Sequence, residues 1–290
     1  MNKSFPICYE TFGNAHDPCI ILIAGIGGQL VDWSSILING LANKGFFVVV
    51  FDNRDAGLSR HYDELGVPNF SEAIATIQQG QLFHPPYTLE DMAADVIALM
   101  DELHIEKAHI VGGSMGGIIA QYVALNYTNR VLSLTCIATT SGDSKLPPAK
   151  KEVLDFFTSS MNPENQSLES AVNKKLQLFK IYNHPDYFDE EKTRTQLISA
   201  FNRAHDSDGF KRLLLAMICA QPRTEQLKTL NIPCLVIHGD YDPVFSVEHG
   251  KQLAESIPGS HLEVIKKMGH GLPDYFAYKI VDLIVSYIKK

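Results

Sequence analysis

Short apolar runs alternate with longer stretches of helical period along most of this chain, and this alternation limits its fold more than any other feature. Six runs have the length of a strand, at residues 19–25, 46–52, 108–113, 131–138, 233–239 and 261–265. Such runs separated by helices are typical of a mainly parallel sheet that is covered on both faces. The pattern predicts an α/β fold with these six strands and one short strand or hairpin before them.

The stretches between the runs predict the helices that cover the sheet. Apolar residues recur at helical spacing in residues 89–103, 114–126, 247–257 and 275–288. Residues 143–228 break the alternation, because they contain helical stretches near 148–160, 166–180, 189–203 and 208–220 but no clear strand. We therefore predict a core domain of residues 1–142 and 229–290, with a helical cap inserted at 143–228.

The composition excludes several classes of protein. Apolar residues make up 45% of the 290 residues, as in a globular protein, and the net charge of -8 comes without clusters of Lys or Arg that would attract nucleic acid. No stretch approaches the ~18 apolar residues of a membrane span, and the first residues lack the apolar core of a signal peptide. The five cysteines form no CxxC pair. We expect a cytoplasmic protein with no nucleic-acid partner and no membrane span.

The sharpest motif is Gly112-Gly113-Ser114-Met115-Gly116, which follows a predicted strand and opens a predicted helix. This context is typical of a nucleophilic serine on a strained turn, where only very small residues fit two positions before and after it. The turn lifts the serine hydroxyl clear of the sheet and points the first helix amides at the substrate. The motif predicts Ser114 as a nucleophile.

A serine hydroxyl needs a nearby base and a third group that fixes the tautomer of that base. Asp240 and Asp242 follow the fifth run, and His270 follows the sixth between two glycines that would let its ring approach Ser114. Residues that follow parallel strands meet at one edge of the sheet. We predict His270 as the general base and Asp242 as the acid that orients it, and we interpret Asp240 as a turn residue.

A second glycine-rich segment, Ala24–Gly28, ends the first run. It lacks both the GxGxxG pattern and the lysine of phosphate-binding loops, so we expect it to supply an oxyanion donor, the amide of Ile26, beside that of Met115. His104, His109 and His261 are interpreted as surface or strand-end residues. No histidine has zinc-ligand spacing, so we predict neither a metal nor a cofactor.

Together these residues resemble the α/β-hydrolase superfamily over nearly the whole chain. Residues 52–59, 87–95, 247–250 and 269–273 are similar to the branch that includes aclacinomycin methylesterase and related bacterial esterases. The resemblance implies a mostly parallel sheet with helices on both faces, a helical cap, no cofactor and an acyl-enzyme resolved by water. Ala24 replaces a histidine that is common in the superfamily. Arg54 and Asp55 are interpreted as structural.

The main functional hypothesis is a serine esterase that acts on a small-molecule carboxylic ester. The same residues could serve carbon–carbon, lactone or amide cleavage or perhydrolysis, and a non-catalytic ligand-binding protein is the alternative from another class. Within the cap, the run 213–218 is interpreted as packing or as an apolar pocket wall. Arg203, His205 and Arg212 fit either a polar substrate group or a solvated helix face, and Trp33 is interpreted as packing.

Overall fold

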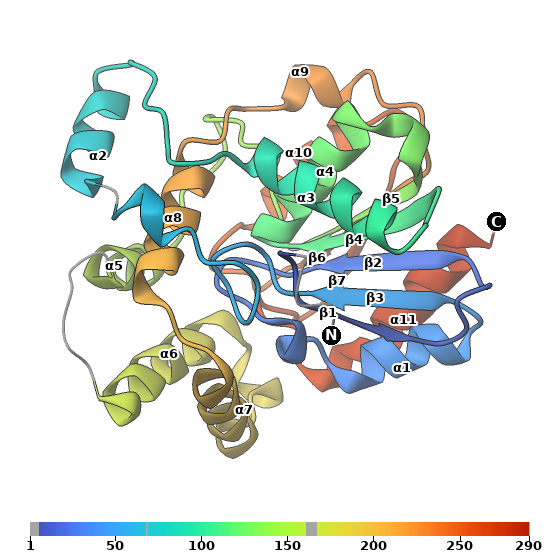
Figure 1. Cartoon of the computed structure of the whole chain (residues 1–290), viewed down its shortest axis with the longest axis horizontal. Helices are drawn as coiled ribbons and strands as arrows, with labels where there is room; N and C mark the ends of the chain where they lie inside the picture. The colour runs from blue at the N-terminus through green and yellow to red at the C-terminus, as the bar shows by residue number, and fades with distance from the viewer. Residues whose placement is uncertain (1–5, 68, 161–166, 290) are drawn as a thin grey trace.

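The computed structural model describes residues 6–67, 69–160 and 167–289 (Figure 1). Its seven-stranded sheet has the order β1-β3-β2-β4-β5-β6-β7. The strands are β1 (Tyr9–Phe12), β2 (Cys19–Ile23), β3 (Phe47–Phe51), β4 (Ala108–Gly113), β5 (Val131–Ile137), β6 (Cys234–Gly239) and β7 (His261–Ile265). Only β1 pairs antiparallel, with β3, and the other pairs are parallel. Each predicted run contains one strand, and β1 is the short strand expected before them.

Helices cover both faces of this sheet, which explains why β2 and β3 are buried and apolar at every position. Figure 1 shows α1 (Ser35–Asn43) and α11 (Asp274–Ile288) on one face, and α3 (Leu89–Glu102), α4 (Met115–Asn126) and α10 (Val247–Ser256) on the other. Successive strand residues point to opposite faces. Ile20 and Leu22 of β2 accordingly pack with α1 and α11, whereas Ile21 and Ile23 pack with α3 and α4.

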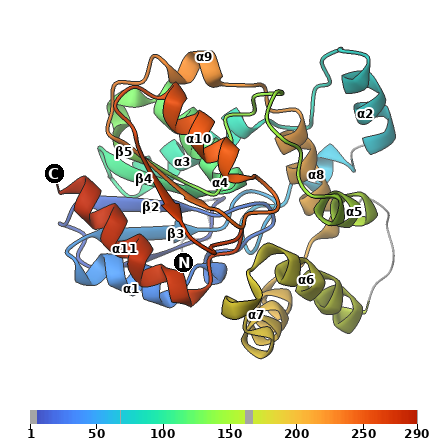
Figure 2. The same cartoon turned by 180° about the vertical axis from the view of Figure 1, so that it is seen from behind.

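The cap follows β5 and lies beside one end of the sheet (Figure 2). Its helices are α5 (Lys151–Ser160), α6 (Leu168–Tyr182), α7 (Glu190–Arg203) and α8 (Ser207–Ile218), and α9 (Thr224–Leu227) leads back to β6. The four predicted helices match within a few residues, although residue 166, which starts one of them, lies outside the described residues. Apolar residues of α6 and α7 (Val172, Leu176 and Leu197) form a cluster of their own. The boundaries at 142/143 and 228/229 stay a prediction.

Residues 59–87 lie outside every strand and helix predicted from the sequence, yet they contain α2 (Phe70–Gln78). Asn69 caps the helix by accepting a hydrogen bond from the amide of Glu72 at 3.1 Å. Phe70 and Ala73 are its buried residues, and they pack with residues of α8. Phe70, Ala73, Ile74 and Ile77 recur at helical spacing, but nine residues form a helix too short to be stable alone, so α2 depends on its tertiary contacts. Residue 68 of this segment lies outside the described residues.

Short 3-10 helices occur at Leu30–Asp32, Asp63–Leu65, Thr128–Arg130 and Pro185–Tyr187. Within the described ranges, no helix combines the length and the apolar character needed to cross a membrane.

Candidate active site

Ser114 occupies the junction between β4 and α4, in a backbone conformation that few residues adopt. Its φ is 54° and its ψ is -122°, and non-glycine residues with positive φ are strained. Its amide donates to the carbonyl of Ile137 at 2.9 Å, and the Thr139 hydroxyl donates to its carbonyl at 2.7 Å. The neighbouring strand β5 therefore holds the serine in this turn.

The glycines on either side of Ser114 are required by close backbone contacts. A Cβ atom at Gly112 would lie 2.1 Å from the carbonyl oxygen of Gly116. A Cβ atom at Gly116 would lie 2.0 Å from the carbonyl oxygen of Ile23 in β2. These distances confirm that only residues without a side chain fit two positions before and after Ser114.

Three residues from separate loops form a continuous hydrogen-bond chain. His270 Nε2 lies 2.9 Å from Ser114 Oγ, and His270 Nδ1 lies 2.9 Å from Asp242 Oδ2. The other oxygen of Asp242 accepts from the amides of Val244 at 2.8 Å and Phe245 at 3.0 Å, which orients the carboxylate. Asp242 rather than Asp240 thus reaches His270.

Asp240 holds a different loop in place. Its Oδ1 accepts from the amide of Lys267 at 2.6 Å, just before the loop that carries His270. Lys267 has a φ of 63°, so this bond helps to fix an unusual conformation at the end of β7.

The loop Ala24–Gly28, called the oxyanion loop below, lies against Ser114. A Cβ atom at Gly25 would be 3.2 Å from the Cβ of Ser114, and Ile26 follows directly. Met115 is the first residue of α4, where backbone amides have no partner within the helix. The structure therefore brings the residues of both expected donor amides next to the serine.

The family described as the alpha/beta hydrolase fold matches residues 18–275. This chain belongs to the α/β-hydrolase family. A rhodomycin D methylesterase, DauP of Streptomyces sp. (strain C5), is 28% identical over 91% of this chain and 88% of its own length. A 3-oxoadipate enol-lactonase of Acinetobacter baylyi is 26% identical over 89% of this chain and 84% of its own length. Among solved structures, an enol-lactonase from Burkholderia xenovorans covers 98% of this chain and 96% of its own, with a TM-score of 0.75 and 22% identity.

The two glycines beside His270 serve this α/β-hydrolase in a way that the sequence did not indicate. They were expected to let the imidazole approach Ser114. A Cβ atom at Gly269 would instead lie 1.8 Å from the carbonyl oxygen of Tyr182, and one at Gly271 would lie 2.5 Å from Asn183 Oδ1. The His270 amide donates to that Tyr182 carbonyl at 2.8 Å, and the two rings lie 5.0 Å apart. The glycines make room for the end of cap helix α6.

His238 was missed by the sequence analysis, although its position near the end of a buried run was a usable signal. Its side chain is fully buried, with Nε2 2.7 Å from the carbonyl of Phe245 and 3.5 Å from Asp242 Oδ2. Burial lowers the pKa of His238, so the ring is neutral at pH 7 and donates its Nε2 proton to the Phe245 carbonyl. It packs behind the Asp242 carboxylate. His109, expected at the surface or a strand end, is also buried, and its Nδ1 lies 2.8 Å from the Ser133 hydroxyl.

Arg203 and Arg212, which belong to the predicted cap, form ion pairs with carboxylates of the core. The Arg212 side chain is only 1% exposed, and its Nε donates to Asp55 at 2.7 Å. Burial opposes ionisation of Asp55, but hydrogen bonds from Arg212, Tyr62 and Tyr87 hold its pKa below its usual range. Arg203 pairs with Asp52 at 2.8 Å. Neither arginine lies on a solvated face or is left for a substrate group.

Arg54, on the same loop as Asp55, pairs with Asp95 of α3 at 2.6 Å. The structural interpretation of Arg54 and Asp55 is therefore confirmed. The His205 ring lies against that of Phe201, tilted by 30° with ring centres 4.3 Å apart, and burial lowers the pKa of His205.

The described residues contain one cluster with the residue types of a metal site. Ligand atoms of Asp55, His61 and Asp206 lie within 4.8 Å of one another. Arg212 approaches both carboxylates, at 2.7 and 3.5 Å, and His61 Nδ1 lies 2.6 Å from Asp206. The guanidinium of Arg212 already supplies a positive charge to both carboxylates, so the cluster is an ion-pair network between the core and the cap.

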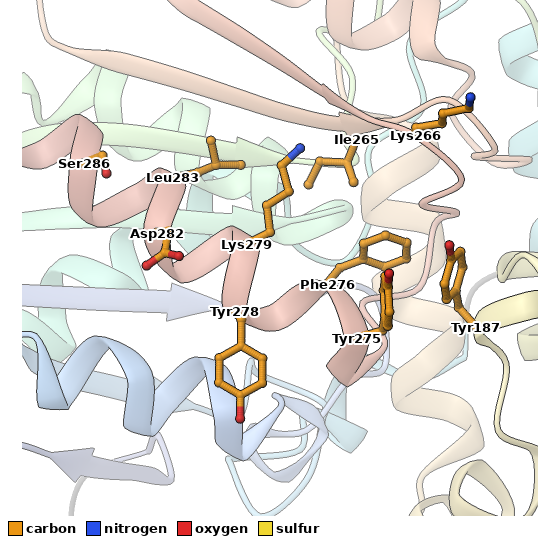
Figure 3. A pocket seen from close by; sticks show the side chains of 10 residues that line it. All are labelled: Tyr187, Ile265, Lys266, Tyr275, Phe276, Tyr278, Lys279, Asp282, Leu283 and Ser286. Carbon is orange, nitrogen blue, oxygen red and sulfur yellow. The ribbon is translucent and has the colours of Figure 1, made fainter.

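A hollow of about 640 Å³ lies on the outer side of α11 (Figure 3). Tyr187 of the cap stacks on Tyr275 at its rim, with ring centres 4.3 Å apart. Ser114, Asp242 and His270 are not among the residues that line it. The hollow is therefore separate from the hydrogen-bonded chain at Ser114.

Proposed function

We propose that this α/β-hydrolase is a serine hydrolase that cleaves a carboxylic ester of a small molecule. The observation that carries the proposal is the chain from Ser114 Oγ through His270 to Asp242, with 2.9 Å at both links. A base within hydrogen-bond reach of a hydroxyl, itself oriented by a carboxylate, is the arrangement that activates serine.

In the proposed reaction, Ser114 Oγ attacks the ester carbonyl while His270 Nε2 takes the hydroxyl proton. His270 then returns this proton to the departing alcohol, which leaves an acyl group on Ser114. A water molecule, deprotonated by the same nitrogen, attacks the acyl group, and His270 passes this proton to Ser114 Oγ as the bond to the acyl group breaks and the acid is released. Asp242 keeps the Nδ1 proton of His270 in place, and the amides of Ile26 and Met115 stabilise each oxyanion.

The named relatives support an ester as the substrate bond. The rhodomycin D methylesterase is an ester hydrolase by its name, and the enol-lactonase acts on a lactone, which is a cyclic ester. A lactone is thus the second candidate substrate, because it needs no change in the chemistry of Ser114. Carbon–carbon cleavage, amide cleavage and perhydrolysis would use the same Ser114, whereas a purely ligand-binding role would not, so fluorophosphonate labelling separates these two groups of alternatives.

The test is release of p-nitrophenol from acetate through decanoate esters, with fluorophosphonate labelling in parallel. The wild type, Ser114→Ala and Ser35→Ala are compared, because Ser35 is an exposed serine at the start of α1. We expect turnover and labelling to vanish only in Ser114→Ala. Labelling without turnover would direct the search to lactones and other acyl groups, whereas a folded wild type with neither signal would favour the ligand-binding alternative.

A further inference from the structure

The oxyanion loop is held to the core at both of its ends. The side-chain amide of Asn53 donates to the carbonyl of Ala24 at 3.1 Å, and Asp52 Oδ1 accepts from the amide of Leu30 at 2.7 Å. Asp52 and Asn53 follow β3 directly, so the neighbouring strand sets the position of the loop ends. Between these ends the loop turns through a bond from the Gly28 amide to the Gly25 carbonyl at 3.1 Å.

The cap holds the same loop through Gln29, the residue directly after it. Gln29 is only 6% exposed, and its Nε2 donates to the carbonyls of Ala200 at 2.8 Å and Ala204 at 3.0 Å. These carbonyls lie at the C-terminal end of α7, where the last carbonyls of a helix lack hydrogen-bond donors within the helix. A side chain of the core thus caps a helix of the cap.

Arg203, the last residue of α7, completes the connection. Its Nη1 donates to Gln29 Oε1 at 2.7 Å and lies 2.8 Å from Asp52 Oδ2, and its Nη2 lies 3.6 Å from Cys8 Sγ. The Asp52 side chain is fully buried. The side-chain amide of Gln29 therefore donates through Nε2 and accepts through Oε1 at the same time. Rotation of this side chain would break several buried hydrogen bonds.

We propose that Gln29 and Arg203 are positioning residues through which helix α7 of the cap fixes the oxyanion loop. The inference rests on the proposed function, because it concerns the oxyanion hole of that site. Donor amides act best when they are already in place as charge develops, so a looser loop should weaken binding of the tetrahedral oxyanion more than binding of the ester. Neither side chain needs to touch the substrate.

The test compares Gln29→Met and Arg203→Met with Arg203→Lys, which keeps the charge, and with Arg60→Met. Arg60 is a matched control, because it pairs with Glu64 on an exposed surface. Three quantities are measured: kcat and KM on an ester that the wild type hydrolyses, inhibition by phenylboronic acid, whose adduct with Ser114 is tetrahedral, and hydrogen exchange of a peptide spanning residues 24–30.

We expect both Met variants to lower kcat by about tenfold and to weaken the boronate by a similar factor, with KM within about twofold of wild type. Exchange over residues 24–30 should become faster, Arg203→Lys should restore part of each effect, and Arg60→Met should change none. A folded Gln29→Met with wild-type exchange and kinetics would overturn the proposal. The proposal would also be overturned if Arg203→Met raised KM and left the affinity for the boronate unchanged, because this result would identify Arg203 as a substrate ligand.

The proposed function can fail separately from this proposal. If the wild type neither turns over any ester nor labels, the hydrogen-exchange comparison still decides whether Gln29 and Arg203 hold the loop. Unchanged exchange in both Met variants would then overturn the connection itself.

Discussion

Ser114 combines a strained backbone with a hydroxyl that is already hydrogen-bonded to its base. The surrounding bonds from Ile137 and Thr139 hold the φ of 54° without help from a substrate. Strain of this kind persists only where the structure around it is rigid. In the proposed reaction, Ser114 is therefore in position for attack before the ester binds.

Asp242→Asn tests the role of the acid at the residue scale. An amide in place of the carboxylate cannot hold the Nδ1 proton of His270 and favours the wrong tautomer. We expect kcat on a p-nitrophenyl ester to fall by roughly 10³-fold to 10⁴-fold, with an unchanged far-UV circular dichroism spectrum. Asp240→Asn is the control, since Asp240 bonds to the Lys267 amide. Equal losses in the two variants would contradict the assignment of Asp242.

The cap helices touch both the loop that carries His270 and the oxyanion loop. The end of α6 contacts His270, the end of α7 holds Gln29, and Phe210 of α8 lies against the oxyanion loop. A Cβ atom at Gly27 would be 2.9 Å from the ring of Phe210, which in turn stacks on Phe157 of α5. If the proposed function holds, these two rings would limit the size of the acyl group beside Ile26.

Phe210→Ala should therefore shift the preference of the enzyme toward longer acyl chains. Removal of the ring opens space beside Gly27, and each methylene that gains a contact adds to the selectivity. We expect the ratio of kcat/KM for decanoate to that for acetate to rise by about tenfold. Phe188→Ala serves as the control, because Phe188 packs in the separate cluster of α6 and α7. If the ratio of kcat/KM values is equal in Phe210→Ala and Phe188→Ala, Phe210 does not line the site that binds the acyl chain.

The pair of Asp55 and Arg212 joins the core to α8 and should contribute to stability in a pH-dependent way. The pKa of Asp55 in the folded state lies below its ordinary value, so the contribution is complete above the unfolded pKa of about 3.9 and is lost as the pH falls through the folded pKa. Asp55→Asn leaves Arg212 buried without its partner. We expect a loss of about 3 kcal/mol in the free energy of unfolding at pH 7.

Urea unfolding at pH 7 and at pH 3 measures this difference. The gap in the free energy of unfolding between wild type and Asp55→Asn should narrow at pH 3, because that pH lies below the unfolded pKa of about 3.9 and proton uptake then favours the unfolded wild type. Asp208→Asn is the control, since Asp208 pairs with Lys211 from an exposed position on the same helix. A gap that stays constant with pH would show that Asp55 acts through packing alone.

At the scale of the whole molecule, the core and the cap share charged and apolar contacts that should make them unfold together. Trp33 is the only tryptophan, and it lies in the core just after the oxyanion loop, whereas much of the helix belongs to the cap. Trp33 fluorescence and far-UV circular dichroism should therefore give the same urea midpoint. An earlier transition seen by circular dichroism alone would mean that the cap unfolds separately, in line with the predicted domain boundaries.

Local patterns were sufficient to predict the strands, most of the helices and the positions of Ser114, Asp242 and His270. A buried parallel strand needs a continuous apolar run, and a serine on a tight strand-to-helix turn needs glycines two residues away on both sides, as Gly112 and Gly116 show. The pattern of such a run or turn spans only a few residues, so it can be recognised in the sequence, although the contact that requires Gly116 is made with Ile23 of β2. The cytoplasmic location and the lack of a nucleic-acid partner rest on composition alone and stay predictions.

Only the tertiary structure decided the partners of residues far apart in the chain. Arg212 pairs with Asp55, which is 157 residues away in the sequence, and Gln29 bonds to the end of α7 at Ala200, which is 171 residues away. Helix α2 and the reason for Gly269 likewise depend on α8 and α6, which pack against them from the cap. Apolar burial is periodic and can be read from the sequence, but a buried charge or amide depends on one particular partner, which the three-dimensional fold alone brings within hydrogen-bond distance.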